Sequence, residues 1–176
     1  MSTSIVTLLH GETEFIPLIL HNFQNFNDQN TLELITSAKD EFEVVALTGF
    51  QNIKLLAQSA IDSNAKIVAI SDESKFNELK EILSGRNIKV LGGKNGILEA
   101  SSAKVDWVMS AIVGSAGLLP GLTALQAGAN VALANKESMV AAGSIMKKVS
   151  QERGVKLLPV DSEHSAVSQV IRGEDR

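Results

Sequence analysis

Two carboxylates, a hydroxyl and an imidazole follow one another near the end of the chain, where Asp161, Ser162, Glu163 and His164 come directly after the apolar run VKLLPV. If that run is a strand, the two carboxylates leave it at a turn and can point to one position beyond the sheet edge. In a chain without cysteine they suit a hard cation such as Mg²⁺ or Mn²⁺. Equally well supported is an alternative in which these residues only cap the helix that follows.

A lysine stands where a second helix is expected to begin, in ALANKESMVAAG at 132–143. Asn135 is a plausible N-cap, which places Lys136 in the first helical turn. A cation there opposes the helix dipole at a cost of about 0.3–1 kcal/mol, so its presence indicates an anion bound nearby. Taken by itself, however, Lys136 is somewhat better explained as a solvated side chain that points away.

Two glycines occur where a predicted strand passes into a predicted helix, in AIVGSAGLLP at 111–120. Gly114 and Gly117 would let the backbone approach a ligand at the carboxyl edge of the sheet, and Pro120 is suited to the start of the helix. On spacing alone, an ordinary tight turn is the better interpretation.

These segments belong to a regular alternation of short β-branched runs and helix-like stretches. Apolar runs separated by amphipathic helices are typical of parallel strands joined by right-handed crossovers. The sequence therefore predicts an α/β fold with a Rossmann-like, doubly wound parallel sheet. Its strands are expected near residues 44–48, 67–71, 88–91, 106–112, 130–134 and 155–160.

The first forty residues break this alternation. The run SIVTLL at 4–9 resembles a first strand, but residues 10–30 are rich in asparagine and are expected to be irregular. In this architecture the first strand normally leads into a glycine-rich loop that binds phosphate. Only Gly11 remains near that place.

Composition excludes several classes of function. A chain of 176 residues with 44% hydrophobic residues can fill a globular core. A net charge of -4 provides no basic field for nucleic acid, and no stretch approaches the roughly 20 apolar residues that span a bilayer. The chain is expected to be soluble. The absence of cysteine fits a reducing compartment, so a cytoplasmic location is expected.

Four segments in order carry a family resemblance: GFQN at 49–52, SAIVGSAGLLPGLTAL, VALANKESMVAAG and LLPVDSEHSAVSQ. From about residue 29 to 176 the chain resembles 1-deoxy-D-xylulose 5-phosphate reductoisomerase. The resemblance implies NADPH-dependent conversion of 1-deoxy-D-xylulose 5-phosphate to 2-C-methyl-D-erythritol 4-phosphate, in non-mevalonate isoprenoid biosynthesis. It implies an NADPH-binding domain over 1–150, atypical over 1–30, and the start of a truncated catalytic domain over 151–176. The expected partners are a sugar phosphate substrate and, in a homodimer, a second copy.

The resemblance also implies roles for individual residues. Lys136, Ser162 and Glu163 are expected in the catalytic site, with Asp161 and Glu163 as ligands of Mn²⁺ or Mg²⁺. Such an ion polarises the carbonyl and hydroxyl oxygens, while Lys136 and Ser162 hold the developing oxygen charge. Gln51 and Asn52 are expected to face the adenosine 2′-phosphate, although neither carries a charge. The remaining residues of the expected cofactor site, most of them around the nicotinamide, are Ala111, Ile112, Gly114, Ser115, Ala116, Asn135 and Glu137.

Two departures from the family lead to an alternative. Where the family has Gly-Ser-Thr-Gly-Ser-Ile-Gly after its first strand, the nearest remnant here is Gly11-Glu12-Thr13-Glu14, whose acids would repel a pyrophosphate. NADPH is therefore expected to bind weakly. The family's third carboxylate ligand, phosphate-binding residues and C-terminal helical domain are missing, so this chain is expected to be impaired. The alternative is a non-catalytic nucleotide-binding remnant or an interaction module.

Overall fold

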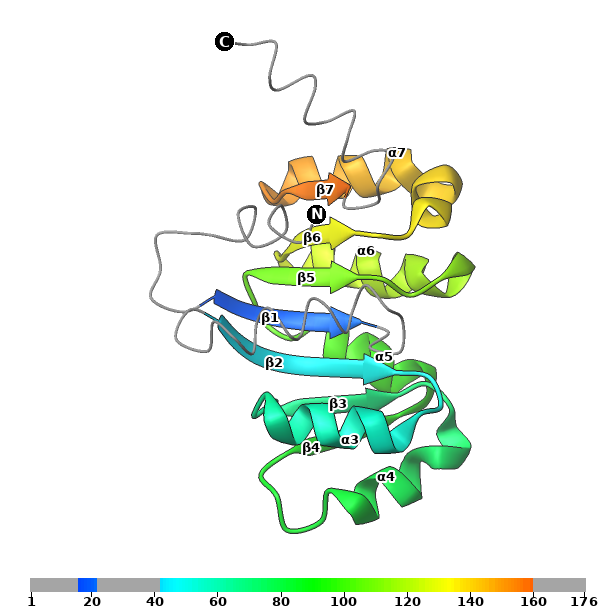
Figure 1. Cartoon of the computed structure of the whole chain (residues 1–176). Coiled ribbons are helices and arrows are strands. Elements are labelled where there is room, and N and C mark those ends of the chain that lie inside the picture. The colour runs from blue at the N-terminus through cyan, green and yellow to red at the C-terminus, as the bar shows by residue number, and fades with distance from the viewer. Residues whose placement is uncertain (1–15, 22–41, 160–176) are drawn as a thin grey trace, which may run out of the picture.

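The computed structural model describes residues 16–21 and 42–159, which form a parallel sheet with helices on both faces (Figure 1). Its seven strands are ordered β4-β3-β2-β1-β5-β6-β7, and every neighbouring pair is parallel. The chain reverses its direction of travel across the sheet beside β1, which lies between β2 and β5. The predicted Rossmann-like, doubly wound fold is confirmed. The strands are β1 (Ile16–His21), β2 (Phe42–Gly49), β3 (Ile67–Ile70), β4 (Lys89–Gly92), β5 (Trp107–Ser110), β6 (Asn130–Leu133) and β7 (Leu157–Pro159).

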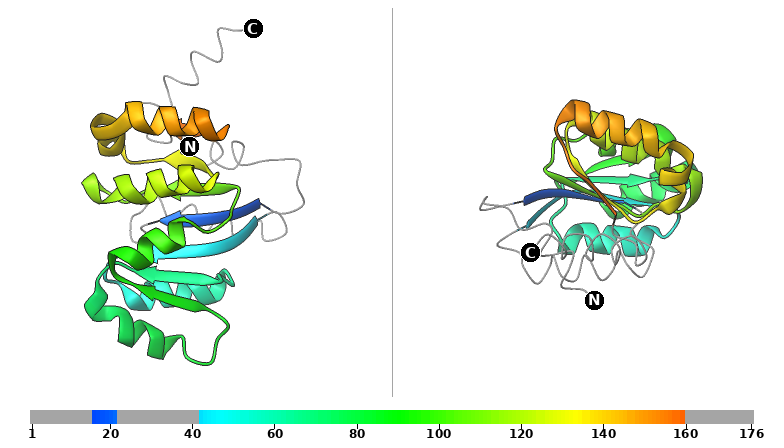
Figure 2. Two further views of the ribbon diagram at one scale, coloured as in Figure 1. Left: turned by 180° about the vertical axis from the view of Figure 1, so that it is seen from behind. Right: turned by 90° about the horizontal axis from the view of Figure 1, so that it is seen from above.

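From β2 onward each strand but the last is followed by a helix, as the alternation of the sequence predicts. The helices are α3 (Ile53–Asp62), α4 (Phe76–Ile82), α5 (Gly93–Ser101), α6 (Leu118–Ala127) and α7 (Lys136–Arg153), with short 3₁₀ turns η1 (Glu73–Lys75) and η2 (Gly114–Gly117). Viewed from above, α3 and α7 lie on opposite faces of the sheet (Figure 2). Helix α6 begins at Leu118, two residues before Pro120, because η2 already turns the chain into it.

Two hydrophobic cores fill the space between the sheet and its helices. On one face Leu47 and Val68 pack with residues of α3 and α4, including Leu56. On the other, Ala46 and Ala69 pack with residues of α5, α6 and α7. Successive strand residues thus enter different cores, which is the period of two expected for strands covered on both faces.

The position of β1 corrects the interpretation of the N-terminal segment. Residues 10–30 were expected to be irregular, yet Ile16–His21 form a central strand that pairs with both β2 and β5. A six-residue apolar run is too short for a stable isolated helix, but it suffices for a strand whose hydrogen-bond partners come from its neighbours. The run SIVTLL lies outside the described residues.

Because β1 is the first described strand, a phosphate-binding loop would be expected after His21. Gly11 precedes β1, so the segment Gly11-Glu12-Thr13-Glu14 is not the loop that follows the first described strand. No glycine occurs between His21 and Gly49. The sequence between β1 and β2 therefore lacks the residue type on which a glycine-rich phosphate loop depends.

The sheet includes a last described strand that follows α7. Residue 150 falls inside α7, which runs to Arg153, and β7 then pairs with β6. The sheet domain thus extends at least to Pro159. None of the helices in 42–159 has the length and apolar character that a bilayer crossing requires.

Candidate functional site

A cavity of about 740 Å³ opens at the carboxyl edge of the sheet. Its walls come from the end of β2 (Thr48 to Phe50), from Ser71 after β3, from the first turns of α5 and α6, and from the segment after β5. Because β2 and β5 are the two neighbours of β1, the cavity lies beside the point where the strand order reverses. Open α/β sheets bind their ligands at this place.

The segment between β5 and α6 forms one wall of this cavity. Ile112, Val113, Ser115 and Ala116 line it, while Gly114 adopts a left-handed φ of +69° that shapes the turn. At Gly117 a Cβ atom would meet the carbonyl oxygen of Ile112 at 2.5 Å. The two glycines are therefore required by the turn itself. The geometry fits the tight-turn interpretation, and the same segment lines the cavity, while its contact with a ligand stays a prediction.

Asn135 ties the wall to the start of α7. Its side-chain oxygen accepts a hydrogen bond from the Ser138 amide at 3.0 Å, which confirms the predicted N-cap. Its side-chain nitrogen donates to the carbonyl oxygens of Ile112 and Gly114, the latter at 2.8 Å. The side chain is 3% exposed. Asn135 thus holds the wall in place, and it is not itself a lining residue.

Lys136 and Glu137 begin α7 at the same edge of the sheet, but they do not line the cavity. Both side chains are exposed, and among the described residues neither forms an ion pair. Helix α7 is kinked at Ala142, where φ is -147°, so the axis of its first turns differs from that of the rest of the helix. Lys136 is therefore available to a ligand that extends from the cavity toward α7.

The two predicted residues that follow β2, Gln51 and Asn52, have different surroundings. The Asn52 side chain caps α3, accepting a hydrogen bond from the Leu55 amide at 3.1 Å. Gln51 is exposed beside the cavity, and Ala111 is buried at the end of β5. Of the predicted cofactor-site residues, Ile112, Ser115 and Ala116 line the cavity directly.

Several lining residues were not predicted as site residues, among them Phe50, Ser71, Lys94 and Leu98. Phe50 lies inside the GFQN segment, while Ser71 directly follows β3 and Lys94 follows β4 closely. Their common signal is a position just after a predicted strand or in the helix that follows it, since parallel strands end at one edge.

The predicted metal and substrate residues Asp161, Ser162 and Glu163 lie outside the described residues, as does His164. Strand β7 ends at Pro159, which pairs with Leu133, so its carboxyl end lies at the same edge as those of the other strands. Within 42–159, no three His, Asp or Glu side chains gather closely enough to hold a metal ion.

Comparison with known proteins gives a consistent result. The family model for 1-deoxy-D-xylulose 5-phosphate reductoisomerase matches residues 28–143. The enzyme of that name from Ruegeria sp. (strain TM1040) is 46% identical over 146 residues, which cover 83% of this chain and 37% of the relative. That from Rhizobium meliloti is 47% identical over 149 residues, covering 84% of this chain and 38% of the relative. The chain thus spans less than half the length of these relatives.

Solved structures agree with these matches. The reductoisomerase from Zymomonas mobilis in complex with NADPH has a TM-score of 0.85 and 42% identity, covering 88% of this chain and 41% of that one. A DOX-P reductoisomerase in complex with NADPH, fosmidomycin and magnesium has a TM-score of 0.83 and 32% identity, covering 88% and 38%.

Proposed function

Since this chain belongs to the 1-deoxy-D-xylulose 5-phosphate reductoisomerase family, we propose that its sheet domain is the NADPH-binding part of such an enzyme. The enzyme would convert 1-deoxy-D-xylulose 5-phosphate to 2-C-methyl-D-erythritol 4-phosphate in non-mevalonate isoprenoid biosynthesis. The observation that carries the proposal is the 740 Å³ cavity beside the reversal of strand order, walled by the segments after β2 and β5.

The described residues fit the two ends of a dinucleotide. The cavity wall of Ile112 and its neighbours is mostly apolar and is held by Asn135, which suits a nicotinamide ring beside β5. Ala111 and Gly114 would support that wall, and the exposed Glu137 would orient neighbouring groups. When bound, NADPH would supply the hydride.

The pyrophosphate between those ends has no glycine-rich cradle in the sequence after β1. We therefore expect NADPH to bind weakly. This feature also favours the second candidate function, a non-catalytic nucleotide-binding or interaction module.

Catalytic roles would fall to Lys136, which begins α7 at the same edge of the sheet, and to residues that follow β7 in the sequence. Lys136 would hold substrate oxygen charge, and the Ser162 hydroxyl would orient the substrate beside it. Asp161 and Glu163 would bind Mg²⁺ or Mn²⁺, an assignment that rests on family resemblance and on the hard oxygen donors of the pair. Magnesium is present in a structure of a relative.

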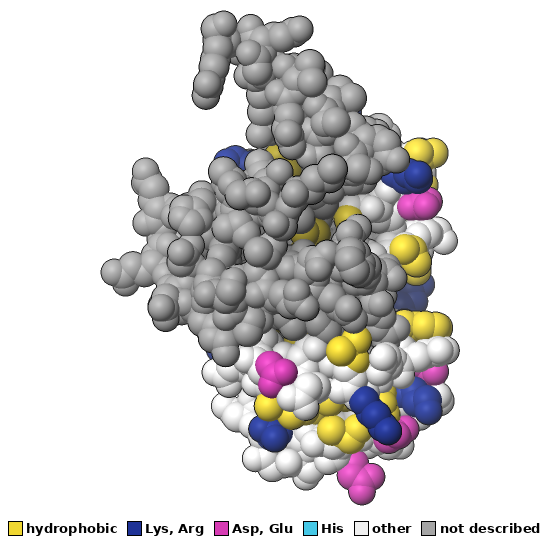
Figure 3. Space-filling model, viewed as in Figure 1, with side chains coloured by type: hydrophobic (Ala, Val, Ile, Leu, Met, Phe, Trp, Pro, Cys, Tyr) yellow, Lys and Arg dark blue, Asp and Glu magenta, His cyan; other side chains and the backbone are white. Residues whose placement is uncertain are grey.

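The proposed partners are a sugar phosphate and a second copy of the chain, in the cytoplasm. Nucleic acid is not proposed, because the net charge of the chain is -4. On the face shown in Figure 3, Lys and Arg side chains are interspersed with Asp and Glu.

A chimera tests the proposal. Residues 42–176 would replace the equivalent segment of the Zymomonas mobilis relative, which would keep its own first strand, phosphate loop and C-terminal half. Turnover of 1-deoxy-D-xylulose 5-phosphate with NADPH and Mn²⁺, lost in the matched Lys136→Ala chimera, is expected. A folded chimera that binds NADPH without turnover would favour the non-catalytic module. A second chimera that also carries residues 1–41 of this chain measures the contribution of the N-terminal segment.

A further inference from the structure

One end of the cavity combines an exposed aromatic ring with apolar side chains from a different element. Phe50, at the end of β2, is 51% exposed although it lines the cavity. Ile97 and Leu98 of α5 line the same cavity. An aromatic ring left open beside aliphatic side chains is suited to a flat heteroaromatic ring, which gains both stacking and apolar contact there.

Among the described residues that line the cavity, Lys94, in the first turn of α5, is the one that carries a charge. Within 42–159 it forms no ion pair, whereas Lys89 lies 2.6 Å from Glu99, Lys66 pairs with Glu43, and Lys75 lies 3.6 Å from Glu78. The ammonium group of Lys94 therefore remains available to an anionic ligand. The free backbone amides at the N-terminus of α5 also attract an anion. An anion beside Lys94 would therefore be stabilised by the ammonium group and by these amides.

A carboxylate lies close to this lysine. The Oε2 atom of Glu73 is 3.2 Å from the position that a Cβ atom on Gly93 would occupy, one residue before Lys94. No ion pair joins Glu73 to Lys94 in the described part of the chain. Glu73 would reduce the attraction of an anion to this end of the cavity, so Lys94 must supply the favourable charge.

The geometry points to Lys94 as the residue that selects a 2′-phosphorylated adenosine, with Phe50 against the adenine ring. This inference rests on the proposed function and goes beyond it. It assigns selectivity for the 2′-phosphate to the first turn of α5. The segment after β2 is less suited to this role, because Gln51 and Asn52 carry no charge. The side chain of Asn52 is already engaged in capping α3.

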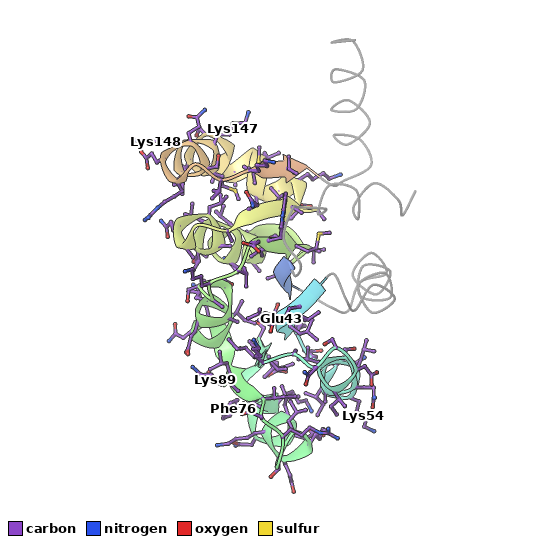
Figure 4. All side chains as sticks on the ribbon, turned by 90° about the vertical axis from the view of Figure 1, so that its left-hand side faces the viewer. Glu43, Lys54, Phe76, Lys89, Lys147 and Lys148 are labelled. Carbon is purple, nitrogen blue, oxygen red and sulfur yellow. The ribbon has the colours of Figure 1, made fainter. Side chains whose placement is uncertain are left out.

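Lys54 is the competing cation. It lies in the first turn of α3, directly after Gln51 and Asn52, but it does not line the cavity. Figure 4 shows α3, with Lys54 labelled, on the opposite side of the sheet from α5. The cavity extends along the α5 side, through Ile97 and Leu98, which favours Lys94.

Calorimetric titration of the full chain with 2′,5′-ADP and 5′-AMP tests this assignment, because the two probes differ only in the 2′-phosphate. Lys94→Met is expected to weaken 2′,5′-ADP binding about tenfold and to change 5′-AMP binding less than twofold, a loss equivalent to one good ion pair. Phe50→Leu is expected to weaken both probes equally. Lys104→Met, three residues beyond the C-terminal end of α5, and Lys54→Met serve as matched charge controls and are expected to bind both probes as the parent does.

An unchanged preference for 2′,5′-ADP in Lys94→Met, or its loss in Lys54→Met instead, would overturn the assignment. A parent chain that does not prefer 2′,5′-ADP would overturn it as well. An NADPH titration of the parent, followed by fluorescence, distinguishes failure of the proposed dinucleotide site from failure of the Lys94 assignment alone. If NADPH binds while Lys94→Met has no effect, the dinucleotide site stands and only the role of Lys94 fails. If neither NADPH nor the probes bind, both fail.

Discussion

The side-chain nitrogen of Asn135 lies 2.8 Å from the carbonyl oxygen of Gly114, a residue 21 positions earlier in the chain. The same nitrogen donates to Ile112, while the side-chain oxygen caps α7. One buried amide therefore links the wall of the cavity to the helix that begins with Lys136. The cavity wall and the proposed catalytic lysine thus keep a fixed relation through this side chain.

Replacing Asn135 separates its two functions. Asn135→Ala removes the cap and both donated hydrogen bonds, so it is expected to lower the free energy of unfolding by about 2–4 kcal/mol. Asn135→Ser keeps an oxygen that can cap α7 and is expected to recover about 1 kcal/mol of that loss. Urea denaturation measures both. A loss below about 0.5 kcal/mol in the alanine variant, typical of an exposed position, would contradict this role.

Two glycines four residues apart make a matched pair. At Gly117 a Cβ atom would meet the Asn135 side-chain nitrogen at 2.6 Å, so Gly117→Ala is expected to destabilise the fold by about 1–3 kcal/mol. At Gly121 the nearest atom, the Cε of Met146, lies at 3.4 Å. Gly121→Ala should therefore be neutral or stabilise α6 by up to about 1 kcal/mol. Thermal unfolding distinguishes them, and equal effects would count against the close packing at Gly117.

Buried serines provide another matched pair. Among the described residues the hydroxyl of Ser110 is buried without a hydrogen-bond partner, whereas that of Ser101 donates to Ile97 at 2.7 Å. Removing an unpaired hydroxyl relieves a desolvation cost, so Ser110→Ala is expected to leave stability unchanged or raise it by about 1 kcal/mol. Ser101→Ala is expected to lower it by about 1 kcal/mol. A clear loss in Ser110→Ala would reveal a partner for that hydroxyl.

The predicted metal ligands are tested by a substitution that keeps their shape. Asp161→Asn removes one anionic ligand and is expected to weaken Mn²⁺ binding by about tenfold or more, with little loss of stability beyond a modest change in capping. Because two protein ligands leave most of an octahedral shell to water, the parent affinity itself is expected to be low. Water relaxation during a manganese titration measures both affinities. Equal affinities would mean that the carboxylates serve only as helix caps.

Sequence patterns predict most of this fold because they depend on local periodicity. The run 67–71 reads as a buried strand from its own residues, and Asn135 reads as a cap from the helix that follows it. Strand β1 was not predicted, because its six residues are stabilised as a strand by the backbones of β2 and β5, which a local pattern does not contain.

The same contrast between local sequence signals and contacts made by distant segments applies to the site. Ile112 was predicted from the family motif, at the end of a predicted strand. Phe50 and Lys94 were not predicted. They line the same cavity only because β2 and β4 end at one edge of the folded sheet. The donor groups of Asn135 were also missed, since their acceptors lie more than 20 residues away in the sequence.

An NADPH titration of the ¹⁵N-labelled chain, followed by amide chemical shifts, tests the central claim that this cavity is a dinucleotide site. The account predicts saturable shifts at cavity residues such as Gly49, Ser71, Lys94 and Ser115, with a dissociation constant weaker than micromolar because no glycine-rich loop follows β1. The amide of Lys104, three residues beyond the C-terminal end of α5, should not shift. Saturable shifts around Lys104 with none at the cavity residues would contradict the account.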